Sequence, residues 1–394
     1  MEGKVKIRAF TIEIIMTSRM LLVFLLLIGS SYAWLEGWQY RMPIQVIELS
    51  GQNITDHPVL VMLNSSNFNF SRTKPDGSDI RFTDANDTLL SYWIEDWNST
   101  TQTAIIRVIV PKLLANENIT IYLYYGNPLA ESLSNQTAVC PGGIHLDIDD
   151  KERCWLFYED FSTDVFSESS EWSRSNPSGV YVDISNGWLT IPSNGVNSDW
   201  AKYDSGKLLV KFSSSMDTAI EVRTFSRYDY WSKYRLGHHQ FLNASGYAYT
   251  FVAHLEWYNQ GWMIYNRWLG ESFSYPFPED VRFVRVRALF NSTHEKLYVR
   301  PSDDRPLRFI GMKANPYGLV ESGIRGIQFK QPWDIRMIVD WVGIRKYAPT
   351  EPKVVFGSEQ TQPPQPTQPV QLNAQMLSLI LIGVAGLMYL TREK

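Results

Sequence analysis

The sequence predicts an all-β ectodomain of two antiparallel β-sandwich domains, placed between a signal peptide and one C-terminal transmembrane helix. Three features lead to this prediction: an apolar run near the N-terminus, another near the C-terminus, and short apolar–polar alternation between them. Alternation with a period of two is typical of strands with one buried face, and long amphipathic helical patterns are missing.

Residues 1–33 have the parts of a secretory signal peptide. Basic residues precede the apolar core at 21–28, and Ser31 and Ala33 are the small residues expected before a cleavage site. The mature chain would begin at Trp34, whether translation starts at Met1, Met16 or Met20. An uncleaved N-terminal anchor is the alternative.

Residues 374–391 are predicted to be the transmembrane helix. At about 1.5 Å per residue they reach roughly 27 Å, close to a hydrocarbon core of about 30 Å. The basic tail 392–394 would lie in the cytoplasm, which leaves the bulk of the chain outside the cell. The Pro/Gln-rich stretch 357–373 is typical of an extended spacer. A buried terminal helix is the alternative for the apolar run.

Nine Asn-x-Ser/Thr sequons favour a glycosylated surface protein, although turn-rich β structure also favours these residues. Seven of the nine fall between residues 53 and 137. The acceptor residues are Asn53, Asn64, Asn69, Asn86, Asn98, Asn118, Asn135, Asn243 and Asn291.

Two cysteines, Cys140 and Cys154, are the only ones in the chain, so in an oxidising exterior we expect a disulfide between them, with free buried thiols as the alternative. The net charge of −4 argues against nucleic acid as a partner, because nucleic-acid binding requires a basic face.

The first sandwich is predicted at residues 34–137. Its strands are expected at 40–46, 57–63, 79–82, 89–95, 103–111 and 119–125. Three blocks in this part, 38–44, 76–82 with 92–95, and 121–128, resemble a prokaryotic surface domain known only as a domain of unknown function, family 2341. The resemblance implies architecture and location, and it carries no catalytic residues.

A linker with the disulfide loop, 138–154, leads to the second sandwich at 155–356. Its first and last strands, 155–161 and 339–347, resemble the paired end strands of concanavalin A-like jelly rolls of the laminin G or glucanase type. Eight further strands are expected between them, at 186–191, 207–212, 219–225, 246–257, 261–268, 281–290, 296–300 and 326–329.

Aromatic residues in the second sandwich suggest carbohydrate binding, because sugar rings stack on Trp and Tyr. The candidate ligand-binding residues are Trp231, Tyr234, Trp257, Trp262 and Trp268, the last three on or near a hairpin that turns at 259–261. Burial in the core is the alternative for these side chains.

Glucanases of the concanavalin A-like fold carry carboxylates in a Glu-x-Asp-x-(x)-Glu pattern, and no segment here matches it. We therefore expect that the chain is not an enzyme. Asp147, Asp149 and Asp150 could hold a structural calcium ion, but they lack the glycine and distal Glu of a calcium hand. A solvated acidic loop is the preferred interpretation, and no cofactor is expected.

Together these features predict a membrane-anchored surface glycoprotein, of archaeal source, that recognises carbohydrate or another cell-surface ligand. Its partners would be the membrane, through the C-terminal helix, and a polysaccharide or surface glycoprotein. A structural or adhesive envelope protein is the alternative, and a glycoside hydrolase is the third hypothesis.

Overall fold

The structure, a computed structural model, describes residues 34–192, 199–227, 238–252, 254–258, 261–266, 271–275, 283–300, 305–314, 323–331 and 336–363. These residues form an all-β fold, as predicted, with only short helices such as α2 (Gln136–Val139) and α3 (Val165–Glu168). The predicted signal peptide and transmembrane segment lie outside the described residues. Within the described part, no helix has the length and apolar character needed to cross a membrane.

The chain divides into two compact units, Met42–Ser358 and the two ends, Met1–Arg41 with Glu359–Lys394. In the unit of the ends, the first residues of β1 (Tyr40–Ile47) pair with β29 (Gln360–Thr361). Arg41 supports this pairing, because its Nε donates to Gln360 Oε1 at 2.7 Å and its guanidinium lies over the Trp34 ring. Part of the predicted spacer therefore forms a short strand.

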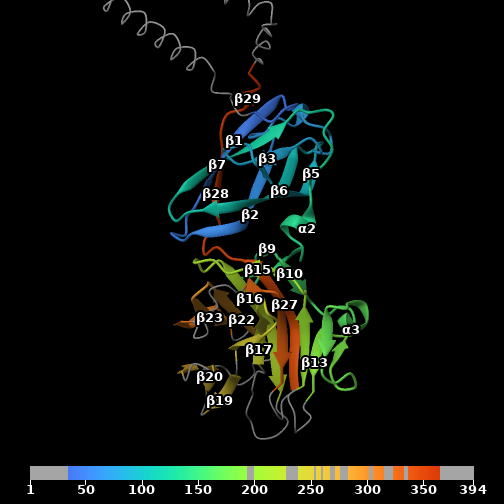
Figure 1. The fold of residues 1–394 in the computed structure, drawn as a ribbon, viewed down its shortest axis with the longest axis vertical. Coiled ribbons are helices and arrows are strands. Elements are labelled where there is room, and N and C mark those ends of the chain that lie inside the picture. The colour runs from blue at the N-terminus through green and yellow to red at the C-terminus, as the bar shows by residue number, and fades with distance from the viewer. Residues whose placement is uncertain are drawn as a thin grey trace, which may run out of the picture. The chain divides into compact units, whose positions relative to one another are not determined.

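The first sandwich has two sheets (Figure 1). One contains β1, β3 (Arg81–Thr83), β4 (Leu89–Leu90), β7 (Asn118–Tyr125) and β28 (Lys353–Phe356); the other contains β2 (Ile54–Asn64), β5 (Tyr92–Asn98) and β6 (Thr103–Leu113). Alternate residues of β1, namely Met42, Ile44 and Val46, are buried, as its alternation predicts. Phe82 of β3 contacts Tyr92 of β5 with 5.5 Å between ring centroids, so the two sheets face each other.

β28 is the clearest departure from the predicted organisation. It falls within the range assigned to the second sandwich, yet it pairs with β1 in the register Ile44 to Phe356. The two strands are about three hundred residues apart in the sequence, so no local pattern reveals their pairing.

The second sandwich also has two sheets. An eight-stranded sheet contains β10 (Phe157–Glu159), β12 (Tyr181–Asp183), β13 (Trp188–Ile191), β16 (Thr218–Arg227), β22 (Val284–Phe290), β23 (His294–Arg300), β24 (Arg308–Ala314) and β27 (Arg336–Lys346). A five-stranded sheet contains β11 (Trp172–Arg174), β14 (Trp200–Asp204), β17 (His238–Leu242), β18 (Ala248–Val252) and β26 (Gly326–Lys330). The predicted pairing of the end strands is confirmed, because β10 runs antiparallel to β27.

The core of the second sandwich lies between these sheets. Val222 of β16, Val286 of β22 and Ile344 of β27 line it from the large sheet, and Phe241 and Phe329 line it from the small sheet. Each strand therefore turns every second side chain inward. The alternate residues of the large sheet face away from the core.

Smaller sheets complete the fold. β8 (Ile144–Leu146) pairs with β9 (Glu152–Cys154), β15 (Val210–Lys211) pairs with β25 (Gly323–Ile324), and β19 (His254–Tyr258), β20 (Gly261–Asn266) and β21 (Glu271–Tyr275) form a three-stranded sheet. The predicted hairpin around 259–261 is confirmed by the backbone pairing of Trp257 with Trp262. The single strand expected at 246–257 is instead two strands, β18 and β19.

Candidate functional site

The candidate site lies on the side of the eight-stranded sheet that faces away from the core, called here the outer face. Strand alternation assigns its residues. On β16, Ile220 and Val222 belong to the core cluster. Glu221 lies between them and Arg223 follows Val222, so both lie on the outer face. The same reasoning places Arg285 and Arg287 of β22, Arg300 of β23, and Trp341, Gly343 and Arg345 of β27 on this face.

One half of the outer face is covered by the β8–β9 hairpin and holds an arginine–carboxylate cluster. Glu221 is fully buried, and its Oε1 accepts hydrogen bonds from Arg287 Nε at 2.9 Å and Arg345 Nη2 at 2.8 Å. Its other oxygen accepts the backbone N–H of Ile148, at the tip of the hairpin, at 2.9 Å. Glu221 therefore joins the hairpin to three strands of the sheet.

The hairpin contributes its own carboxylates to this cluster. Asp147, 1% exposed, accepts from Arg345 Nη2 at 3.2 Å and from Arg153 Nε at 3.2 Å. Asp149 accepts from Arg287 Nη2 at 2.9 Å. Asp150 accepts from Arg285 Nη1 at 2.7 Å and from Arg300 Nη1 at 3.0 Å.

The interpretation as a solvated acidic loop is therefore wrong for Asp147, which is buried, whereas the side chains of Asp149 and Asp150 are 36% and 53% exposed. The oxygens of all three face arginines. In the part of the chain that is described, no group of three or more His, Cys, Asp or Glu residues is arranged to hold a metal ion. The sequence does not reveal these partners because, apart from Arg153, the arginines that bind these carboxylates lie 135 or more residues further along the chain.

Burial by itself would raise the pKa of Asp147, but Arg345, the backbone N–H of Lys151 and Arg287 outweigh burial and hold the pKa below its usual value. For Asp150, hydrogen bonds from Arg285 and Arg300 likewise outweigh burial and lower the pKa. Both carboxylates are thus ionised in the folded protein near neutral pH.

Trp155 packs against the covered half of the outer face. The Trp155 ring lies over Gly343, where an added Cβ would come within 2.4 Å of the ring, so only glycine permits this contact. Trp155 Nε1 donates to the carbonyl of His145 at 3.0 Å. His145 in turn stacks on Tyr158 with 3.7 Å between centroids. The hairpin is therefore held by ring packing as well as by charge.

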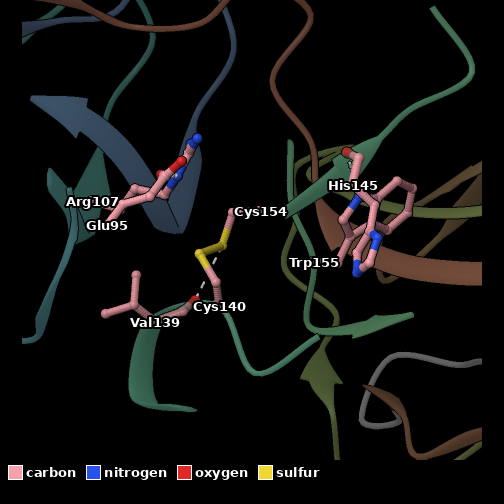
Figure 2. The surroundings of a disulfide bond; sticks show 7 residues. All are labelled: Glu95, Arg107, Val139, Cys140, His145, Cys154 and Trp155. Carbon is pink, nitrogen blue, oxygen red and sulfur yellow. Dashed lines mark hydrogen bonds and ion pairs between the residues drawn. A yellow bond between two sulfur atoms is a disulfide. The ribbon is translucent and has the colours of Figure 1, made fainter. Parts of the chain in front are cut away.

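The hairpin is also tied by the disulfide between Cys140 and Cys154, which confirms the predicted pairing (Figure 2). Cys140 follows α2, and Cys154 ends β9. The pair packs with Val139, against half-buried Trp93 and Ile109 of the first sandwich. The disulfide thus fixes both ends of the segment that covers the outer face.

The β8–β9 hairpin does not cover the other half of the outer face, and the residues of that half differ in composition. We call it the aromatic patch: Tyr158, Trp188, Phe283 and Trp341, with Arg223 and Asp340. Tyr158 and Trp341 stack with centroids 5.8 Å apart, and Trp188 lies 5.7 Å from Phe283. Trp188, Phe283 and Tyr158 are half-buried, so parts of their rings remain in contact with solvent.

A polar pair lies among these rings. Asp340 accepts from Trp188 Nε1 at 3.1 Å and from Arg223 Nη1 at 2.6 Å. The Arg223 guanidinium lies 4.2 Å from the centroid of Phe283. The side chains of Arg223 and Asp340 are 21% and 20% exposed, so the pair combines fixed geometry with access to solvent. Aromatic faces beside a fixed donor–acceptor pair are suited to a ligand with both apolar faces and hydroxyl groups.

The residues chosen from the sequence as ligand-binding are not those of the aromatic patch. Trp231, Tyr234 and Trp268 lie outside the described residues, and for Trp257 and Trp262 only the backbone is described. Trp188 and Trp341 were missed. Alternation in 339–347 could have found Trp341, since it has the opposite phase to the core residues Val342 and Ile344.

The sequon asparagines differ in exposure. Six are exposed: Asn64, Asn69, Asn86, Asn98, Asn118 and Asn135. Asn53 and Asn291 are half-buried, and Asn243 is 8% exposed. The Asn243 side chain also accepts backbone N–H groups of Ser245 and Tyr247, so it is the acceptor least accessible to a glycan.

Comparison with solved structures returns glucanases, a xylosidase and a carbohydrate recognition domain. An endo-beta-1,3-glucanase from Pyrococcus furiosus is 13% identical, covering 52% of this chain and 98% of that one with a TM-score of 0.35. A xylan beta-1,4-xylosidase from Bacillus halodurans is 10% identical, covering 48% and 38%, with a TM-score of 0.32. The metal-free Emp46p carbohydrate recognition domain is 12% identical, covering 48% and 97%, with a TM-score of 0.32.

These similarities carry no residue-level correspondence. The glucanases and the xylosidase among them nevertheless contradict the expectation that the chain is not an enzyme. The expectation rested on one carboxylate spacing along one strand, which was too narrow a criterion, because carboxylates from different strands can also meet on a sheet.

Among curated proteins, none matches the chain. A family match covers residues 76–175, which include the second and third blocks that carried the resemblance and extend into the second sandwich. The family is a domain of unknown function, DUF2341. The chain thus matches the DUF2341 model over residues 76–175, and its second sandwich is built from an eight-stranded and a five-stranded sheet.

Proposed function

We propose that this protein recognises carbohydrate at a cell surface and that the aromatic patch is its binding surface. The observation that carries the proposal is the arrangement of Trp188 and Phe283 around the Arg223–Asp340 pair. The C–H faces of a sugar ring can stack on the half-buried aromatic rings, while the guanidinium and carboxylate hydrogen-bond to hydroxyls.

The pair is suited to this task because it is already held in place. Asp340 accepts from both Trp188 and Arg223, so three polar groups have fixed orientations before a ligand arrives. Groups that need no ordering on binding lose less conformational entropy, which favours affinity. The covered half of the outer face has no comparable access, because the hairpin and its carboxylates occupy it.

The test is a titration of the full-length chain with a panel of soluble polysaccharides, followed by tryptophan fluorescence and by calorimetry. Trp188→Ala should weaken binding of the responding glycan by about tenfold or more, because stacking on one ring contributes roughly 1–3 kcal/mol in comparable contacts with planar ligands. Trp200→Ala is the matched control, since Trp200 is also half-buried but lies on the five-stranded sheet.

Equal losses in the two variants, or no response to any glycan, would reject the aromatic patch as the binding surface. The same samples should be assayed for new reducing ends, because the similar solved structures include glucanases. Release of reducing ends that Asp340→Asn abolishes would extend recognition to hydrolysis, and glycan binding without release would limit the function to recognition.

We also propose that the protein is anchored in the membrane of an archaeal cell through residues 374–391 and carries glycans on its exposed sequons. The apolar run with its basic tail supports the anchor, and the six exposed acceptors support the glycans. Deletion of 374–394 should release the chain into the medium, and retention in the membrane fraction would contradict the proposed anchor.

A further inference from the structure

A cavity of about 410 Å³ lies beside the disulfide, away from the aromatic patch. Its walls come from β2, β6, β9, the end of β27 and the segment that leads into β28. No residue of the aromatic patch lines it. Its volume is within the range of roughly 300–1,000 Å³ that small-molecule sites occupy.

Cationic side chains dominate the polar part of this cavity. Arg107, Arg153, Arg345 and Lys346 line it, against the carboxylates of Glu152 and Glu351. Both Glu351 oxygens are already engaged, one by His57 Nε2 at 2.8 Å and the other by Arg153 Nη1 at 2.8 Å. Burial raises the pKa of Glu351, but His57 and Arg153 outweigh it and lower that pKa to about 2, so Glu351 stays an acceptor for these two groups.

Two of the lining residues retain unused hydrogen-bonding groups. Arg107 is 8% exposed, and its Nε donates to Glu95 at 2.8 Å. Figure 2 shows this pair near the disulfide. Among the described residues, no acceptor contacts its two terminal nitrogens. His57 is 3% exposed, and its Nδ1 has no hydrogen-bond partner in the described part of the chain. The His57 Nδ1 atom is buried without a partner, which costs free energy unless a ligand satisfies it, whereas the terminal nitrogens of Arg107 are not among the buried atoms that lack a partner.

Apolar side chains also line the cavity. Leu60 and Met62 of β2 are 38% and 58% exposed, beside the exposed polar residues Asn64 and Glu152. Val354 and Phe356 of β28 line it as well. A ligand with an apolar body would cover these side chains and remove them from water.

We propose that this cavity binds a small organic carboxylate, with its anionic head on Arg107 and Arg153 and its apolar body against Leu60 and Met62. The guanidinium of Arg107 offers two parallel N–H donors, the geometry that a carboxylate accepts in a bidentate pair. The carboxylate could come from an aliphatic acid or from an acidic sugar, and the exposed side chains of Leu60 and Met62 favour the aliphatic acid.

The first experiment is calorimetric titration of the full-length chain with hexanoate, with hexanamide as the uncharged isostere and with glucuronate. Hexanoate should bind at least tenfold more tightly than hexanamide, and more tightly than glucuronate. Tighter binding of glucuronate would keep the carboxylate site and assign it to an acidic sugar. Equal binding of hexanoate and hexanamide, or no binding of either acid, would overturn the proposal.

The second experiment locates the site. Leu60→Trp should fill the cavity and abolish hexanoate binding, while Leu89→Trp is the matched control, because Leu89 is 52% exposed on β4 and does not line the cavity. Arg107→Lys, which keeps the charge and loses the fork, should weaken binding by about tenfold. Hexanoate binding that is unchanged in a folded Leu60→Trp variant would place the ligand elsewhere and refute this site.

Discussion

The two halves of the outer face are built from neighbouring residues of the same strands, yet one half is buried under a hairpin and the other is partly exposed to solvent. Glu221 and Arg287 lie under the β8–β9 hairpin, where every charge meets a counter-charge. Arg223 lies one outward position further along β16 and stays 21% exposed beside Asp340. The strands alone therefore do not define a site. The segment that covers one half decides which polar groups become structural and which remain available to a ligand.

The comparison predicts its largest effect at Glu221. Glu221→Gln removes the negative charge between Arg287 and Arg345 and leaves both buried. Removing one partner from a buried ion pair typically costs about 3–5 kcal/mol. Asp149 and Asp147 still pair with Arg287 and Arg345, but the cluster loses one negative charge from its interior. We therefore expect a loss of this size in the free energy of unfolding, measured by urea denaturation.

Asp340→Asn is the control on the aromatic patch. The Arg223–Asp340 pair is about one-fifth exposed, and such pairs are screened by water, so this change should cost less than about 1 kcal/mol of stability. Similar losses for the two variants would show that the halves do not differ in the way proposed.

The disulfide is expected to have the next largest effect. Replacing Cys140 and Cys154 by serine opens the loop that carries Asp147, Asp149 and Asp150. On the chain-entropy description, closing a loop of about 15 residues stabilises a fold by roughly 3 kcal/mol.

Amide hydrogen exchange would sharpen this second prediction. Protection should fall at β8 and β9 and remain unchanged at β11 and β14, which belong to the small sheet. Unchanged protection of β8 and β9 in the double serine variant would show that ion pairs and ring packing hold the hairpin without the disulfide.

The smallest effect concerns pH. The pKa of Asp147 is lower in the folded protein than the unfolded value of about 3.9. Its ionised form therefore stabilises the fold at pH values above about 3.9, and this stabilisation is lost as the pH falls from there toward the folded pKa. Asp150 acts in the same direction.

We thus expect the free energy of unfolding to decrease between about pH 5 and pH 3, with a shallower slope in Asp147→Asn. Thermal unfolding at several pH values measures both slopes. An identical slope in the two proteins would mean that other carboxylates account for the acid sensitivity.

Local patterns in the amino-acid sequence predict the all-β class, most strands of both sandwiches and the disulfide. Alternation reports which face of a strand is buried, as for Met42, Ile44 and Val46, and two cysteines in one chain leave a single pairing. These features depend on neighbours within a few residues or on simple counting, so the sequence suffices.

Long-range packing, by contrast, sets the partners of the acidic loop, the strand pairing of β28 and the composition of the outer face. Asp147 meets Arg345, and Ile44 pairs with Phe356, across roughly two hundred and three hundred residues respectively. Alternation could indicate that Arg223 and Trp341 point away from the core, but not that the hairpin leaves them uncovered. That outcome depends on where distant segments pack, and a carboxylate that looks solvated in the sequence becomes structural once buried arginines neutralise it.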